Sequence, residues 1–222
     1  MSTYVLMRLL ESAPRRYDLG IALLTFGQVG RAYDRLVRDI EPGERVLDIG
    51  SGTGALAVRA ARRGAVVRGI DINPEMLAIA RERVREAHLE ERVELVEQGV
   101  AELDALKAET FDSVVSGLCF SELSHDELRY TLDQVVRVLK PGGLLRVADE
   151  IRPARPIARS IHYLVRAPLL VFTYLLTQQT SHAVRELPEL LAAAGLSLVS
   201  VETRALGSFG VFVARKPGGA PS

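Results

Sequence analysis

The stretch VLDIGSGTG, residues Val46 to Gly54, decides the fold because an apolar run ends there in alternating glycines. The apolar part surrounds a single acid, Asp48, which is typical of a strand buried in a parallel sheet. The glycines let the backbone turn sharply and let a ligand approach closely. The next residues, ALAVRAARR at 55–63, predict a helix. Strand, turn and helix together indicate a nucleotide-type site, with backbone N–H groups and a helix N-terminus facing the ligand.

Predicted strands and helices alternate along the rest of the chain. Strands are expected at residues 45–50, 66–71, 92–98, 111–117 and 144–150, with helices at 55–63, 74–90 and 124–139. A helix at 187–195 and two closing strands at 196–203 and 209–216 complete the pattern. This alternation predicts an α/β fold: a Rossmann-like, seven-stranded, mostly parallel sheet with helices on both faces. The last strand follows a short turn and is expected to be antiparallel, at or near one edge.

Two of the predicted helices carry recognisable start signals. Pro74 is a good first residue for the helix at 74–90. Ser124 with Glu127 three residues later forms a capping-box pattern at the start of the helix at 124–139.

The composition of the 222-residue chain excludes several classes of protein. Its length and its 48% hydrophobic content fit one α/β domain with a substantial core. Basic and acidic residues balance at 28 each, which argues against a nucleic-acid binder held by a strong net field. The single cysteine, Cys119, excludes an internal disulfide and argues against a cysteine-built zinc site. No carboxylate cluster suggests a metal, so no metal is expected.

The N-terminal and apolar segments carry no pattern of targeting or membrane insertion. Residues 1–16, MSTYVLMRLLESAPRR, have a short apolar run with positive charges after it, unlike a secretory signal. The longest apolar run, APLLVFTYLL from Ala167, is shorter than the roughly 20 residues that span a bilayer. Together with the single cysteine, these features predict a cytoplasmic protein.

The spacing of the glycines distinguishes between nucleotide ligands. A dinucleotide fingerprint has the spacing G-x-G-x-x-G, whereas residues 50–54 have G-x-G-x-G. Asp71 ends the second strand, where a carboxylate can accept both ribose hydroxyls of an adenosine ligand. VLKPGG, residues 138–143, precedes the fifth strand. A glycine turn alone is a weak signal, but these three features in this order form a specific set.

With these motifs the sequence, from about Glu44 to Lys216, resembles the class I S-adenosylmethionine-dependent methyltransferases. The resemblance implies that S-adenosylmethionine is the cofactor and that the glycine turn carries its methionine part. It places Asp48, Gly50, Ser51 and Gly52 near the amino-acid end, Asp71 at the ribose, Ile72 at the ribose and one adenine face, Val100 and Ala101 at the adenine edge, and Ser116 beside the methionine carboxylate or the sulfonium.

One position departs from the pattern of this family. Many relatives have an acid where this chain has Val100, and that acid accepts a hydrogen bond from the adenine amino group. Here Glu102, a backbone carbonyl or water must accept it. The N-terminal segment and SGLCFSEL, residues 116–123, are also similar to a small subgroup found beside corrinoid-dependent methyl-transfer systems.

Further side chains are candidates for contact with the cofactor or the acceptor. In relatives the N-terminal helices close over the cofactor, so Tyr17 and Tyr33 are expected to touch it, with core packing as the alternative. The candidate catalytic residues are Cys119, Asp149 and His162. A free cysteine is more often a buried apolar residue, whereas an acid at the end of a strand lies where open α/β sheets bind ligands.

The expected domain organisation follows from the same resemblance. It comprises an N-terminal helical cap at 1–43, a methyltransferase domain at 44–216 with a helical lid insertion at 152–183, and a disordered tail at 217–222. In the insertion, Arg155, Arg159, His162 and Arg166 recur at helical spacing as a cationic stripe. The stripe fits a solvated helix face, a lid over an anionic or apolar substrate, or a contact with a protein partner or a membrane surface.

Methyl transfer from a sulfonium is an in-line displacement, which needs alignment and exclusion of water more than a catalytic set of side chains. SGLCFS at 116–121 lacks the Asn/Asp-Pro-Pro-aromatic motif of DNA amino-methyltransferases, and a single cysteine argues against arsenite methylation. The expected acceptor is a small molecule: a thiol, a phenol or quinone-like compound, a lipid or a corrinoid-related acceptor. Two alternatives remain open: a non-catalytic S-adenosylmethionine-binding module that acts on a protein partner, and a nicotinamide-dependent oxidoreductase.

Overall fold

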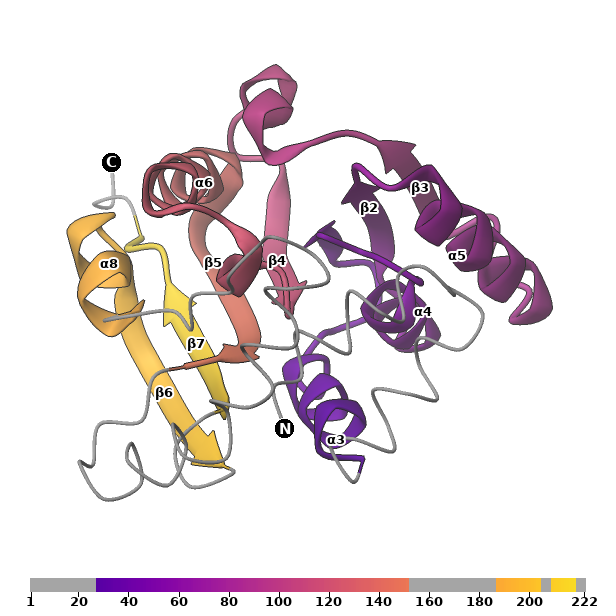
Figure 1. The fold of residues 1–222 in the computed structure, drawn as a ribbon, viewed down its shortest axis with the longest axis horizontal. Helices are drawn as coiled ribbons and strands as arrows, with labels where there is room; N and C mark the ends of the chain where they lie inside the picture. The colour runs from indigo at the N-terminus through magenta and orange to yellow at the C-terminus, as the bar shows by residue number, and fades with distance from the viewer. Residues whose placement is uncertain (1–26, 152–186, 205–208, 219–222) are drawn as a thin grey trace, which may run out of the picture.

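A computed structural model describes residues 27–151, 187–204 and 209–218, which form one sheet with helices on both faces (Figure 1). The strands are β1 Arg45–Ile49, β2 Val66–Asp71, β3 Val93–Glu97, β4 Phe111–Gly117, β5 Leu139–Glu150, β6 Ser197–Arg204 and β7 Phe209–Arg215. Their order is β3-β2-β1-β4-β5-β7-β6. Strands β1 to β5 pair in parallel, and β7 runs antiparallel between β5 and β6. The predicted seven-stranded sheet is confirmed, with its antiparallel strand one place in from the edge.

The helices form a layer on each side of the sheet. They are α3 Gln28–Leu36, α4 Ala55–Arg62, α5 Pro74–Glu86, α6 His125–Val138 and α8 Leu187–Ala193, with the short 3₁₀ helices η1 Val100–Ala105 and η2 Phe120–Glu122. Helices α3 and α4 share a core that includes Leu36 and Ala57. Helices α6 and α8 share a second core, which includes Leu132 and Leu191. The central strands are buried between the two cores, as their continuous apolar runs predict.

The start signals of the two marked helices act as predicted. The Ser124 hydroxyl accepts a hydrogen bond from the Glu127 N–H at 3.3 Å, and the Glu127 carboxylate accepts one from the Ser124 N–H at 2.8 Å. These two bonds complete the capping box of α6. Helix α5 begins at Pro74, and the side chain of Asn73 caps it by accepting from the Glu75 N–H at 3.0 Å.

Helix α5 ends at Glu86 and not at the predicted residue 90. His88 adopts a left-handed conformation with φ 55°. Its N–H donates to the Arg85 carbonyl and the Leu89 N–H donates to the Val84 carbonyl, both at 3.0 Å. This is a Schellman-type ending, which usually has glycine where this chain has histidine. The residue types at this helix end therefore carry no local signal for the earlier stop.

The order of the strands places a crevice at the carboxyl end of β1. This strand lies between β2 and β4, so that Ile49 pairs with Ile70 on one side and with Ser116 on the other. The chain leaves β1 toward β2, and the later strand β4 adds on the opposite side. Such a reversal of strand order is the point at which open α/β sheets bind ligands. The glycine turn follows β1 there directly.

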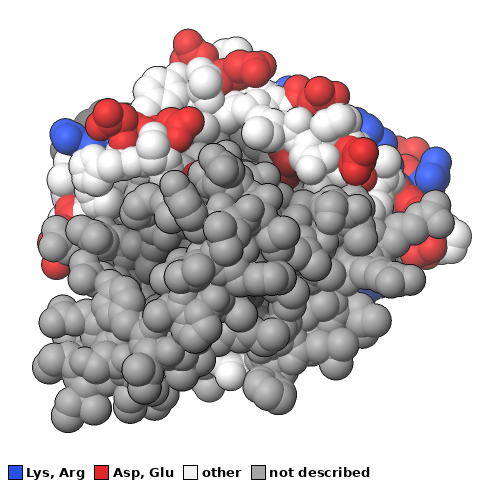
Figure 2. Space-filling model, viewed as in Figure 1, with Lys and Arg blue, Asp and Glu red and all other residues white. Residues whose placement is uncertain are grey.

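The described face of the molecule has an acidic rim. Figure 2 shows Asp and Glu side chains gathered over the region of η1 and the start of α6. Exposed acids there include Glu102, Asp104, Glu122, Asp126 and Glu127. A rim of this sign repels polyanions, in keeping with the balanced charge of the whole chain.

Several predicted segments lie outside the described residues. They are residues 1–26 of the N-terminal cap, the insertion at 152–183 with its cationic stripe, and residues 219–222 of the tail. Among the helices that are described, none is both long enough and apolar enough to cross a membrane.

Candidate active site

The glycine turn after β1 has the backbone geometry that only glycine adopts easily. Gly50 has φ 68° and Gly52 has φ 52°, both in the left-handed region. The Ser51 N–H donates to the Ile70 carbonyl at 2.9 Å, which ties the turn to the end of β2. A Cβ placed on Gly52 would meet nothing nearer than the Gly50 carbonyl oxygen at 4.0 Å. Gly52 therefore presents bare backbone to open space, as a ligand cradle requires.

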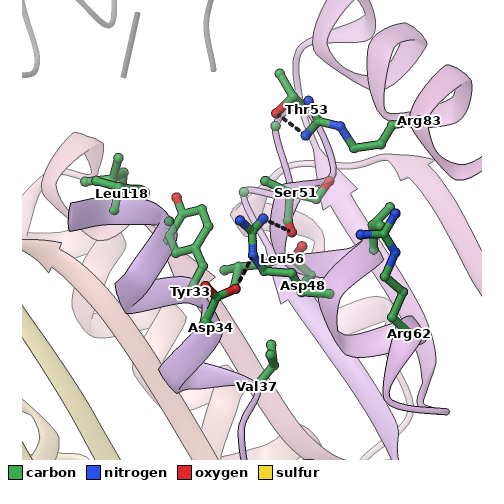
Figure 3. A pocket seen from close by; sticks show the side chains of 18 of the residues that line it. Tyr33, Asp34, Val37, Asp48, Ser51, Thr53, Leu56, Arg62, Arg83 and Leu118 are labelled. Atoms are coloured by element: carbon green, nitrogen blue, oxygen red, sulfur yellow. Dashed lines mark hydrogen bonds and ion pairs between the residues drawn. The ribbon is translucent and has the colours of Figure 1, made fainter. Parts of the chain in front are cut away.

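A cavity of about 800 Å³ opens in front of this turn. Its walls come from the turn, from α3 and α4, from the last turn of α5 and from the loop after β4 (Figure 3). Five of the residues predicted to bind cofactor line it: Asp48, Gly50, Ser51, Gly52 and Tyr33. The structure thus brings the predicted methionine-end residues together with a tyrosine from the N-terminal cap.

Asp48 is a buried acid whose charge is not satisfied. Its side chain is 0% exposed, and neither carboxylate oxygen has a hydrogen-bond partner of good geometry among the described residues. Burial, and secondarily the negative charge of Asp71, raise the pKa of Asp48 to about 7, an effect that the Ala57 backbone N–H partly offsets. An uncompensated buried carboxylate is strongly unfavourable, so Asp48 needs either a proton or a cationic ligand.

Asp71 reaches from the end of β2 to the glycine turn. One carboxylate oxygen accepts from the Gly52 N–H at 2.7 Å, and the other accepts from the Asn73 N–H at 2.8 Å. Each carboxylate oxygen can accept a second hydrogen bond. Asp71 therefore holds the turn in shape and retains acceptor capacity for the two hydroxyls of a ribose.

The residues predicted to lie at the adenine form a separate group outside the cavity. Ile72 is 73% exposed, Val100 is half-buried and Ala101 is exposed. A Cβ placed on Gly99 would lie 3.1 Å from the Ile72 side chain and 4.0 Å from a carboxylate oxygen of Glu102. Ile72 and Glu102 thus face the same short segment after β3, where the resemblance places the adenine and where an acceptor for its amino group was needed.

Ser116 is turned away from the cavity. Its side chain is fully buried, and its hydroxyl donates to the Ile49 carbonyl at 3.0 Å. It does not line the cavity, unlike Gly117 and Leu118 directly after it. The structure therefore gives Ser116 a place between β4 and β1, and the predicted contact with the methionine end stays a prediction.

Cys119 packs against the glycine turn. A Cβ placed on Gly50 would lie 2.6 Å from both the Cβ and the Sγ of Cys119. Burial, with the nearby carboxylates of Glu122, Asp149 and Asp71, raises the pKa of the Cys119 thiol well above its usual range. The thiol is therefore protonated at neutral pH and is a poor nucleophile.

Asp149, near the end of β5, accepts a hydrogen bond from the loop after β4. It is fully buried, and its carboxylate accepts from the Ser121 N–H at 3.2 Å and from the Glu150 N–H at 2.7 Å. Burial raises the pKa of Asp149 to about 7, although these hydrogen bonds act in the opposite direction. Asp149 can exchange a proton near neutral pH, but it does not line the cavity. Its predicted role as a general base stays a prediction.

Tyr33, on α3, contacts residues of two other elements that line the cavity, β4 and α4. A Cβ placed on Gly117 would lie 2.5 Å from the Tyr33 ring and hydroxyl, so β4 must end in a residue without a side chain. The Arg59 guanidinium lies 5.8 Å from the centroid of the Tyr33 ring. Arg59 is fixed by hydrogen bonds to the Asp34 carboxylate and the Ala55 carbonyl, both at 2.8 Å. Tyr33 thus lies against the end of β4 and lines the cavity, and the predicted closing role of the N-terminal cap stays a prediction.

Sequence reasoning named five of the twenty residues that line this cavity, and Gly117 and Leu118 are among those it missed. Gly117 reads as the ordinary end of a strand, and only the three-dimensional proximity of Tyr33 reveals why glycine is needed. Leu118 has φ 59°, a left-handed conformation for which a leucine gives no sequence signal. Two predicted residues, Tyr17 and His162, lie outside the described residues, so their roles stay predictions.

Known proteins share both the sequence and the fold. A family model for a methyltransferase domain matches residues 46–143. The chain is 33% identical over 178 residues to the uncharacterized methyltransferase sll0829 of Synechocystis, a match that covers 79% of this chain and 77% of that protein. It is 31% identical over 183 residues to a demethylmenaquinone methyltransferase of Corynebacterium glutamicum, covering 81% of this chain and 71% of that enzyme.

The fold is similar to that of a methyltransferase solved in complex with the Trm112 methyltransferase activator of Haloferax volcanii. The TM-score is 0.71 at 18% sequence identity, and the match covers 96% of this chain and 98% of the other. Identity this low shows the fold alone, whereas the curated relatives match at over 30% identity across more than two thirds of both chains. The chain therefore belongs to the class I S-adenosylmethionine-dependent methyltransferases, enzymes that use S-adenosylmethionine as methyl donor.

Proposed function

We propose that this enzyme transfers the methyl group of S-adenosylmethionine to a small, uncharged aromatic acceptor of the hydroquinone class. The similarity to a demethylmenaquinone methyltransferase supports this acceptor class over a thiol or a corrinoid-related acceptor. The cavity has an apolar part that suits such an acceptor, formed by Val29, Tyr33, Leu56 and Leu118 beside the glycine turn. Arginines line another part of the same cavity: Arg59, Arg62, Arg63 and Arg83. The acidic rim disfavours a polyanionic acceptor such as nucleic acid.

The observation that carries the proposal is the unsatisfied carboxylate of Asp48. The methionine end of the cofactor bears an ammonium group, which is the cation that a buried carboxylate beside this turn requires. The open space at Gly52 accommodates the amino-acid backbone of that end. Asp71 would accept the ribose hydroxyls, and Glu102 would accept the adenine amino group in place of the acid absent at Val100. The residues present therefore fit the cofactor.

When bound, S-adenosylmethionine supplies an electrophilic methyl group that the acceptor displaces in line from sulfur. The task of the protein is to align the acceptor and to exclude water from it. Tyr33 and Leu118 are placed to do both, because they cover the side of the cavity that faces the turn. The neutral thiol of Cys119 adds packing and no covalent step. The proton released by the acceptor leaves to solvent.

Transfer of a labelled methyl group tests this proposal. The purified enzyme is mixed with methyl-labelled S-adenosylmethionine and a reduced demethylmenaquinone analogue that has a short side chain. We expect label in the hydroquinone and an equal amount of S-adenosylhomocysteine. Asp48→Asn should lower the yield at limiting cofactor, whereas Leu132→Ala, in the opposite core, should not. Label that enters a thiol or an amine in the same screen, and never the hydroquinone, would contradict the proposed acceptor.

A further inference from the structure

Leu118 has an unusual backbone for its residue type and position. Among the described residues, only His88, Glu109 and Leu118 combine a positive φ with a side chain. The first two are exposed and lie in turns, where such a conformation is common. Leu118 instead is 4% exposed, directly follows β4 and lines the cavity. A buried leucine in the left-handed region is disfavoured unless its surroundings impose it.

Three successive contacts impose this conformation. The Leu118 N–H donates to the Ala148 carbonyl at 2.9 Å, which extends the pairing of β4 with β5. On one side Gly117 has its backbone against Tyr33, and on the other Cys119 packs against Gly50. The backbone therefore has no room to relax toward an ordinary strand or helix geometry. Strain that is held in this way at a ligand site is characteristic of functional positions.

The strained backbone determines where the Leu118 side chain lies. Figure 3 shows Leu118 beside Tyr33, on the side of the cavity across from Ser51 and Thr53. Both residues line the cavity, and Leu118 belongs to the core cluster against which Tyr33 packs. Arg59 stacks on the Tyr33 ring and fixes it in place. A rigid apolar wall of this kind suits a flat aromatic ring better than a flexible or charged molecule.

We propose that Leu118 and Tyr33 pack against the aromatic ring of the methyl acceptor and thereby determine which acceptors fit. This inference rests on the proposed function for the class of acceptor. According to this inference, the strained conformation of Leu118 serves acceptor specificity, and Leu118 does not contribute to cofactor binding.

Binding of a simple ring tests the inference without the need for turnover. The probe is 1,4-dihydroxynaphthalene, titrated by calorimetry under reducing conditions into protein saturated with S-adenosylhomocysteine. Leu118→Ala and Leu118→Gly should weaken probe binding by about tenfold, the scale for loss of a buried leucine contact. Both should bind S-adenosylhomocysteine within about twofold of the unaltered enzyme. Leu132→Ala is the matched control, because it truncates a buried leucine of α6 far from the cavity and should bind both ligands normally.

Thermal melting of the two variants tests the strain itself. At an ordinary position glycine is less stable than alanine, because it has more freedom in the unfolded chain. At a left-handed position the order reverses, so Leu118→Gly should melt at a higher temperature than Leu118→Ala. A melting temperature of Leu118→Ala at or above that of Leu118→Gly would overturn the inferred strain.

The outcomes separate this inference from the proposed reaction. Probe binding that is unchanged in both Leu118 variants would overturn the inference, as would an unaltered enzyme that fails to bind the probe. Probe binding that depends on Leu118, with no methyl transfer to any hydroquinone, would support the wall while contradicting the proposed reaction.

Discussion

The most distinctive residue of this site is Asp48, a buried acid with a raised pKa. The strand pattern alone predicted a buried acid before the glycine turn. The structure adds that this acid is completely buried and that neither carboxylate oxygen has a hydrogen-bond partner of good geometry among the described residues. The pKa of about 7 means that the free enzyme holds a proton there over much of the acidic range. The raised pKa of Asp48 could not be predicted from the sequence, because it depends on burial and on Asp71, which is distant in the sequence.

Cofactor binding should depend on pH through Asp48. An ammonium ligand requires the ionised carboxylate, so binding releases a proton when the pH lies below about 7. Affinity for S-adenosylhomocysteine should fall as the pH drops below 7, approaching about tenfold per pH unit. Asp48→Asn should bind more weakly at pH 8 and lose this dependence, as measured by calorimetry. Asp149 titrates in the same range, so Asp149→Asn is the control, and it should keep the dependence. A pH dependence that persists in Asp48→Asn would refute this role.

The same pKa sets the sign of a stability effect in the free enzyme. The pKa of Asp48 is raised on folding from 3.8 to about 7, so the native state holds the proton more tightly than the unfolded state. The free energy of unfolding should therefore decrease as the pH rises from about 4 to 7. Asp48→Asn should show a shallower decrease in urea unfolding measured across this range. An equally steep decrease would mean that Asp48 is ionised in the free enzyme.

Asp71 is expected to have two functions that one substitution removes together. Asp71→Ala should lower cofactor affinity by about 1.5–3 kcal/mol, the range for hydrogen bonds to a charged group. It should also loosen the glycine turn, because the Gly52 N–H loses its acceptor. Glu97→Ala is the matched control, since Glu97 pairs with Asp71 at the same edge of the sheet and is exposed. Equal dissociation constants for Asp71→Ala and the unaltered enzyme would exclude Asp71 from the ribose site.

At the scale of the elements, local sequence signals predicted the starts of α5 and α6 and missed the end of α5. The capping box of α6 and Pro74 at the start of α5 predicted where those helices begin, because each cap is made within four residues. The 3₁₀ helix η1 and the early end of α5 were not predicted. His88 and Leu118 adopt left-handed conformations through hydrogen bonds and packing, for which neither residue type is a signal.

The contact between α3 and β4 can be measured by a double-mutant cycle. Gly117→Ala should destabilise the enzyme by about 1–3 kcal/mol, the usual range for overpacking, because the new methyl group overlaps Tyr33. In a Tyr33→Ala background the same change should lose most of that effect, since the space is then free. Urea unfolding of the four proteins gives the coupling energy. Additive effects would show that Tyr33 does not pack against Gly117 in solution.

At the scale of the whole molecule, the parallel sheet and the location of the site after β1 were predicted from the alternation of strands and helices and from the glycine turn, whereas the order of the strands comes from the structure. The antiparallel β7 was predicted from the short turn that precedes it, and the structure confirms it. Tyr33 could be named as a candidate only through resemblance to a family, because its proximity to Gly117 joins residues 84 positions apart. The roles of the segment 152–183 and its cationic stripe stay predictions.

Ligand-dependent stability of the whole domain distinguishes the two nucleotide classes. A ligand at 100 times its dissociation constant stabilises the folded state by about 2.7 kcal/mol. For a chain of this size that is a rise of roughly 5–11 °C in melting temperature. S-adenosylmethionine should produce this rise and NAD should not, because the turn has G-x-G-x-G spacing and its Asp48 calls for a cation. A comparable rise with NAD would reinstate the oxidoreductase alternative.

The most direct test of the central claim is the structure of the enzyme in complex with S-adenosylhomocysteine. We expect the methionine amino group at hydrogen-bond distance, about 3 Å, from the Asp48 carboxylate, and the ribose hydroxyls on Asp71. The thioether sulfur should face the wall formed by Tyr33 and Leu118. A complex in which the ligand lies elsewhere, with both Asp48 oxygens still without a partner, would contradict this account.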